Sequence, residues 1–306
     1  MANIKEIKGR IGSIKDTQKI TNAMYLISST KLRRAKNELD KTRPYFRQLQ
    51  GEIKRIFRTV PDVDSHYFYP VEGQPELNGT YGCLVITADK GLAGAYNHNI
   101  LKMALKMWEE HSDLKLFVVG EYGRHFFTQK KIPIEQSFLY PAQSPTIHRA
   151  RDICATMLDM YDNNQLEKIY VLYTDLKNGM TAEAASTRLL PFHRGSFTTP
   201  DHENHGLNYE FTPDVKTILN NIIPSYLTGF IYSALVDSFC SEQNTRMTAM
   251  NSAGDNAEEM LEKLSVEYNH IRQSQITQEI TEIASGANAA KKKKERMVQE
   301  RADRND

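Results

Sequence analysis

An apolar repeat of 3.5 residues fills the first 56 residues, and it limits the fold more than any other feature of the chain. With Ile4 at position a of a heptad, the repeat holds over more than seven heptads. This pattern is typical of a long coiled-coil helix that packs against a partner along one seam. The a positions are Ile4, Ile11, Gln18, Tyr25, Leu32, Leu39, Phe46 and Ile53, and the d positions are Ile7, Ile14, Thr21, Ser28, Ala35, Thr42, Leu49 and Ile56.

A second long helix is predicted over residues 216–290. Its a positions are Met247, Gly254, Leu261 and Tyr268, and its d positions are Met250, Ala257, Leu264 and Ile271. The two helices flank the rest of the chain, so they can pair in antiparallel fashion. If Leu219 lies beside Ile56, the first helix ends opposite residue 271.

The apolar stripe of the second helix changes phase at that point. It continues at Ile276, Ile280, Ile283 and Ala287. An apolar stripe in water is unfavourable, so this one requires a partner outside the chain. The first helix carries a comparable second stripe at Ile20, Met24 and Ile27.

The middle of the chain alternates strand-like and helix-like segments, which predicts a mainly parallel sheet with helices on its faces. The predicted strands are 81–87, 115–119, 168–173 and 184–192, and the predicted helices are 97–110, 123–130 and 147–163. The fold class is therefore α/β plus a long antiparallel coiled coil, with a central Rossmann-like domain. The predicted parts are a first helix (1–60), an α/β domain (78–195), a polar loop (196–214), a second helix (215–290) and a charged tail (291–306).

The net charge of +1 is unevenly distributed. Residues 1–60 hold 15 basic and 5 acidic side chains, and the region 61–289 holds 17 basic and 29 acidic ones. A basic segment of this kind favours an acidic protein partner, a nucleic acid or a membrane surface. No apolar run is long enough to span a bilayer, the first residues do not form a secretory signal, and three scattered cysteines favour a reducing compartment.

Few residues suggest chemistry. The turn Asp89–Asn97 follows a strand and opens a helix, where a phosphate can bind, but it lacks the glycine patterns of nucleotide sites. Asp175 follows a strand without a second catalytic group, and His202 and His205 lack metal-ligand spacing. We therefore expect no catalytic residue, metal or cofactor, with an α/β enzyme that uses this turn as an open alternative.

The basic cluster Lys31, Arg33, Arg34 and Lys36 leaves two further alternatives. One is a nucleic-acid-binding protein, although no base-reading motif accompanies the cluster. The other is a coiled-coil scaffold with a solvated basic face.

Three segments carry a family resemblance. Residues 7–36 (IKGRIGSIKDTQKITNAMYLISSTKLRRAK) closely resemble the opening of the gamma subunit of F-type ATP synthases. Residues 241–289 resemble its closing helix, and TADKGLAGAYN at 87–97 resembles the motif after its first strand. The resemblance covers residues 1–289.

The resemblance implies a non-catalytic rotor. In this family the coiled coil turns inside a hexamer of alpha and beta subunits. The α/β domain and a foot sit on the membrane ring of c subunits, next to the epsilon subunit. The complex is peripheral, on the cytoplasmic face of the cell membrane in bacteria, and it couples ion flow to ATP synthesis or hydrolysis.

The resemblance also assigns residues. The expected hexamer contacts are Met24, Arg246, Arg272, Gln273, Thr277, Glu279 and Glu282, and the expected ring-contacting foot is Leu207, Tyr209, Glu210 and Phe211. Two features depart from the family pattern: Gly254 stands where threonine is usual, and a charged tail follows residue 290. We expect this tail to be a solvated, frayed helix end, with a rotational brake as the alternative.

Overall fold

The computed structural model describes residues 4–60, 63–69, 79–111, 113–177, 181–193, 197 and 210–302, with side chains up to residue 293. It divides into a helical unit, residues 1–24 and 250–306, and a larger unit, residues 25–249. Two helices, α1 (Ile4–Thr59) and α5 (Val215–Ala302), contribute to both units. Within the described ranges, no helix is long and apolar enough to cross a membrane.

In the helical unit, the predicted seam is confirmed. Ile7 and Met250 are buried, and the other seam positions of this unit are buried or half-buried. Thr21 faces Gly254, with its Oγ1 3.9 Å from the place that a Cβ on Gly254 would take. Counting along the two antiparallel helices from this pair brings Ile4 opposite Ile271.

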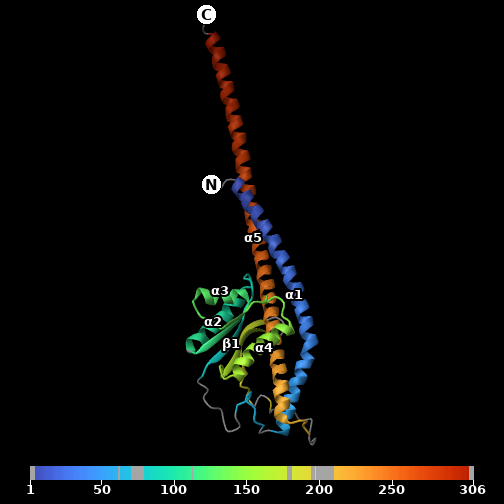
Figure 1. Cartoon of the computed structure of the whole chain (residues 1–306). Helices are drawn as coiled ribbons and strands as arrows, with labels where there is room; N and C mark the ends of the chain where they lie inside the picture. The colour runs from blue at the N-terminus through green and yellow to red at the C-terminus, as the bar shows by residue number, and fades with distance from the viewer. Residues whose placement is uncertain are drawn as a thin grey trace. The chain divides into compact units, whose positions relative to one another are not determined.

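Beyond Ile271, α5 continues without a partner in this unit (Figure 1). Every described side chain of α5 from residue 272 to 293 is exposed. The residue of α5 opposite the end of α1 was therefore predicted correctly. The length of α1 and the antiparallel arrangement of the two helices both follow from the sequence.

In the larger unit, the same two helices pack through aromatic side chains. The rings of Phe46 and Tyr232 lie 6.3 Å apart. A Cβ on Gly229 would lie 1.9 Å from Cδ1 of Phe46, so the close packing requires glycine at this position. This contact repeats the antiparallel pairing of the helical unit.

Five strands form one sheet in the order β3-β2-β1-β4-β5. The first four strands are parallel, and β5 pairs antiparallel with β4. The strands are β1 (Tyr81–Ile86), β2 (Leu114–Val119), β3 (Gln136–Phe138), β4 (Lys168–Lys177) and β5 (Thr181–Leu190). The helices between them are α2 (Tyr96–Glu110), α3 (Glu121–Gln129) and α4 (Ile147–Asp162).

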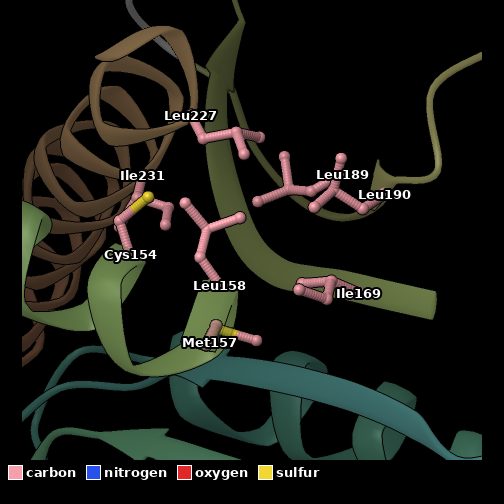
Figure 2. A pocket seen from close by; sticks show the side chains of 8 residues that line it. All are labelled: Cys154, Met157, Leu158, Ile169, Leu189, Leu190, Leu227 and Ile231. Carbon is pink, nitrogen blue, oxygen red and sulfur yellow. The ribbon is translucent and has the colours of Figure 1, made fainter. Parts of the chain in front are cut away.

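The two faces of the sheet have different cores. Cys83 and Val85 of β1 belong to a cluster with α2 and α3. Leu84 and Ile86, which alternate with them, belong to a cluster with α4, α1 and α5. Figure 2 shows the second core from close by, where α4 side chains meet β5 and α5 across a small apolar gap. Helix α5 is thus part of the sheet's own covering layer.

Several details differ from the sequence prediction. Strand β4 runs to Lys177 rather than to residue 173, and β5 ends at Leu190 rather than at residue 192. Strand β3 was missed, because three residues are too few to show a pattern. Strand β5 begins at Thr181 rather than residue 184, because pairing with β4 compensates for its small and polar side chains. Helix α5 extends to Ala302, because propagating an existing helix through good helix formers needs no new nucleus. The predicted loop is described only at residues 197 and 210–214, and residues 303–306 of the tail also lie outside the described ranges.

Candidate functional site

The turn that follows β1 is held by bonds within the chain. The Thr87 hydroxyl donates to the Val119 carbonyl at 2.9 Å and accepts from Gly123 N–H at 3.0 Å. Gly120, with φ at 96°, lies so close that a Cβ would be 2.2 Å from the Thr87 carbonyl oxygen. The end of β1 is therefore fixed to the end of β2 and the start of α3.

Asp89 and Asn97 continue this internal bonding. The Asp89 carboxylate accepts from Glu121 N–H and from Gln143 N–H, each at 3.3 Å. The Asn97 side chain accepts from Ala88 N–H at 2.9 Å. The polar groups that sequence reasoning considered for a phosphate site are instead bonded to neighbouring backbone.

The crevice at the topological switch point is filled by α5. In this strand order the switch point lies between β1 and β4, where open α/β sheets usually bind ligands. Here Thr174 N–H donates to the Ser238 hydroxyl at 3.1 Å, and the Ser241 hydroxyl donates to the Thr174 carbonyl at 3.2 Å. A helix of the chain itself takes the usual place of a ligand.

A buried ion pair completes this contact. Arg246 Nη1 lies 2.5 Å from Glu242 Oε1, and the two residues are 8% and 1% exposed. Arg246 Nη2 also donates to the Gly91 carbonyl at 3.0 Å and to the Lys90 carbonyl at 3.4 Å. Burial raises the pKa of Glu242, and the adjacent Arg246 guanidinium opposes that shift.

The structure gives Arg246 partners within the chain. The resemblance implies a hexamer contact for Arg246, which stays a prediction, and the guanidinium is bonded to Glu242 and to the Gly91 carbonyl. Its partner Glu242 was missed. The signal was available in the sequence: glutamate and arginine four residues apart, directly after Ser238 and Ser241, in a segment where small side chains allow close approach.

Other polar candidates do not form a site. In the described ranges, no three histidine, cysteine, aspartate or glutamate side chains gather as metal ligands. His202 and His205 lie outside those ranges. Burial raises the pKa of Cys154 to about 11, which disfavours the nucleophilic thiolate.

One partner-free surface of the described chain is on α5 in the helical unit. Ile276, Ile280 and Ile283 are 44%, 62% and 73% exposed. The family-assigned residues of the same stretch are also exposed: Arg272, Gln273, Thr277, Glu279 and Glu282. The structure thus brings together five of the seven expected hexamer residues on one unpaired helix.

Helix α1 carries a second partner-free surface. In the helical unit, Ile20 is 60% exposed and Met24 is half-buried. In the larger unit, Arg33 and Arg34 of the basic cluster are exposed, whereas Lys31 donates to the Gln143 amide oxygen at 3.1 Å. Part of the basic face is therefore free for an acidic partner.

The expected foot is described only in part. Leu207 and Tyr209 lie outside the described ranges. Glu210 is exposed, and Phe211 is half-buried against the core of the larger unit.

Comparison with known proteins agrees with this architecture. The family model described as ATP synthase matches residues 3–290. The chain belongs to this ATP synthase family, and its relatives are gamma chains. An ATP synthase gamma chain of Acetivibrio thermocellus is 39% identical over 297 residues, which cover 95% of this chain and 100% of the relative. One of Caldanaerobacter subterraneus is 39% identical over 293 residues, which cover 92% and 98%.

Solved structures show the same fold. The rotor of the Euglena gracilis mitochondrial ATP synthase has a TM-score of 0.61 at 14% identity, covering 89% of this chain and 98% of that one. The central stalk of the Tetrahymena thermophila enzyme has a TM-score of 0.59 at 21% identity, covering 76% and 99%. The fold is therefore that of a rotary central stalk, and the family match ends where the charged tail begins.

Proposed function

We propose that this chain is the central rotor subunit of an F-type ATP synthase, not catalytic by itself. The observation that carries the proposal is the stretch of α5 beyond Ile271. Three isoleucines there are exposed on a helix that has lost its partner. Such a stripe is stable when another protein surrounds it.

The partners follow from family membership and fit the surfaces described above. Residues 272–283 of α5, with Met24 of α1, would contact a hexamer of alpha and beta subunits. Exposed Arg33 and Arg34 would face acidic loops of that hexamer. The foot at residues 207–211 would contact the ring of c subunits, with an epsilon subunit beside it.

The mechanism is a coupling free energy between rotation and catalysis. One asymmetric shaft cannot contact three equivalent catalytic sites in the same way. At each angle it stabilises three different conformations, so turning the shaft shifts their equilibria in sequence. Ion flow through the ring would drive ATP release, and ATP hydrolysis would drive the reverse rotation. The complex would lie on the cytoplasmic face of the cell membrane.

The filled crevice supports a non-catalytic role for this chain. Helix α5 takes the place where an α/β enzyme binds its ligand, and it does so with bonds to Thr174 and Gly91. An enzyme that uses the turn 89–97 would first have to release α5.

The experiment is purification of the tagged chain from membranes of its own host. We expect alpha, beta, epsilon and c subunits to co-purify in fixed ratio. Recovery with nucleic acid, in a form released steeply by salt, would instead favour the nucleic-acid alternative. Recovery of the chain alone, with ATPase activity of its own, would favour the α/β enzyme.

A further inference from the structure

Helix α5 is attached to the sheet by two kinds of contact. Against α4 and β5 the contact is apolar, through side chains such as Leu227 and Ile231. Apolar burial is non-directional, so it holds a helix close without fixing its rotation. Hydrogen bonds depend on angle, so they can fix it.

Most described hydrogen bonds between α5 and the α/β domain gather at one place, which we name the crevice joint; outside it, the Cys154 thiol of α4 donates to the Pro224 carbonyl at 3.7 Å. The crevice joint consists of Thr174, Ser238, Ser241, Glu242 and Arg246, together with the carbonyls of Lys90 and Gly91. On the neighbouring side, a Cβ on Gly94 would lie 3.1 Å from Cγ2 of Thr245. The joint therefore connects α5 to both β4 and the turn after β1.

Arg246 is the group that connects the ion pair to the turn. Glu242 and Arg246 are one helical turn apart, so each could neutralise the other without any contact to the sheet. The bonds from Arg246 to Gly91 and Lys90 add an attachment that such a pair does not need. A buried ion pair is costly to desolvate and is a weak source of stability, so a role in fixing geometry is the better explanation.

We propose that Arg246 is a positioning residue that fixes the rotation of α5 relative to the α/β domain, so that torque passes between them through the crevice joint. This inference rests on the rotor function proposed above. The proposed role of Arg246 differs from a direct contact with the hexamer, because Arg246 acts here through the turn at residues 90–91. Without the joint, the domain could turn slightly about α5 and part of each rotation would be lost.

The first measurement is amide hydrogen exchange on the isolated full-length chain. In Arg246→Ala, the amides of Ala88 and Tyr96 should exchange about tenfold faster or more, because local opening becomes easier. Arg246→Lys keeps the charge but replaces the guanidinium fork by a single ammonium nitrogen, so its exchange rates should lie between those of Arg246→Ala and the original chain. Lys106→Ala is the matched control: it removes an ion pair of the same spacing to Glu110, but one that is exposed.

The second measurement is ATP-driven ion transport per ATP hydrolysed in the reconstituted complex. Arg246→Ala should roughly halve this ratio or lower it further, because part of each rotation would no longer pass between the domain and α5. Adding Gly94→Cys and Thr245→Cys to this variant should restore the ratio when the cysteines are oxidised and lose it again on reduction. A Cβ at position 94 would lie 3.1 Å from Cγ2 of Thr245, so the two side chains would be in contact, although a side chain at the φ of 52° strains the backbone. The native cysteines are buried.

Two results would overturn the inference. If the ratio falls but the disulfide does not restore it, Arg246 acts by touching a partner subunit. If exchange becomes faster while the ratio is unchanged, the joint exists but carries no torque. Failure of the original chain to assemble with alpha and beta subunits is a separate result, and it would refute the rotor function together with this inference.

Discussion

The exposed isoleucines of α5 allow a quantitative test of the rotor proposal. The test variant replaces Ile276, Ile280 and Ile283 by serine. Isoleucine and serine have similar helix propensities, so the helix itself should persist. In the described chain all three side chains are exposed. The isolated chain should therefore keep its melting temperature within about 2 °C.

The triple variant should lose free energy only in the step in which the chain binds the hexamer. The exposed fractions of the three isoleucines together amount to about 1.8 whole side chains. Complete covering by a partner is then worth about 3–5 kcal/mol, at about 1.5–3 kcal/mol for each side chain. This energy corresponds to a weakening of the dissociation constant by a factor of about 10² to 10⁴.

The assay is a binding titration of labelled chain against the alpha–beta hexamer, with thermal unfolding of the free chain in parallel. The control variant changes Leu261 and Leu264 to serine. These side chains are half-buried on the α1 seam, so here the free chain should lose stability. Equal destabilisation of the free chain by both variants would refute the reasoning, because the three isoleucines would then pack internally.

Four further predictions follow from the same structure. Met24→Lys should leave assembly intact and lower the number of ions transported per ATP hydrolysed. If this ratio is unchanged, Met24 does not contact the hexamer. Deleting residues 291–306 should leave the ATPase rate unchanged at low and high salt, whereas a rise confined to low salt would indicate a brake, since salt screens such pairs. Burial, with repulsion from Asp175, raises the pKa of Asp237 to about 6, against attraction by Arg43. Between about pH 4 and about pH 6 the folded state therefore holds a proton that the unfolded state has lost, and the free energy of unfolding falls by about 1–3 kcal/mol as the pH rises through this range. Asp237→Asn should remove this fall, as measured by urea titrations. Gly254→Ala should stabilise the free chain by about 0.5–1 kcal/mol, because its Cβ would meet Thr21 only at 3.9 Å, while Gly229→Ala should destabilise it against Phe46.

The helical part of the fold could be predicted from the sequence because its information is local. The heptad places every seam residue of α1, from Ile4 to Ile56, in a buried or half-buried position. The phase change after Ile271 indicates the end of pairing, since the apolar stripe of a helix follows the surface that it packs against. These inferences need periodicity and chain length, and both are visible in one sequence.

The crevice joint could not be predicted in the same way. Its bonds join Thr174 to Ser238 and Gly91 to Arg246, pairs that are far apart in the sequence. Periodicity says which face of α5 is apolar, but it does not say which loop that face meets. Family resemblance assigned Arg246 to a partner, and the buried position of its guanidinium became visible only in three dimensions.

The two features together describe what a rotor requires. Ile276, Ile280 and Ile283 follow one another at intervals of four and three residues, so they lie on one face of the unpaired helix. Glu282 lies on another face of the same turns, and Glu279, four residues before Ile283, borders the apolar face. A surrounding ring of three equivalent sites would meet an apolar side at one angle and a charged side at another. The contact energy then varies with rotation, and work can be extracted from it only if α5 does not turn freely in the α/β domain. The buried pair at Glu242 and Arg246 supplies that restraint, so an asymmetric surface without the joint, or the joint without the surface, would not couple rotation to catalysis.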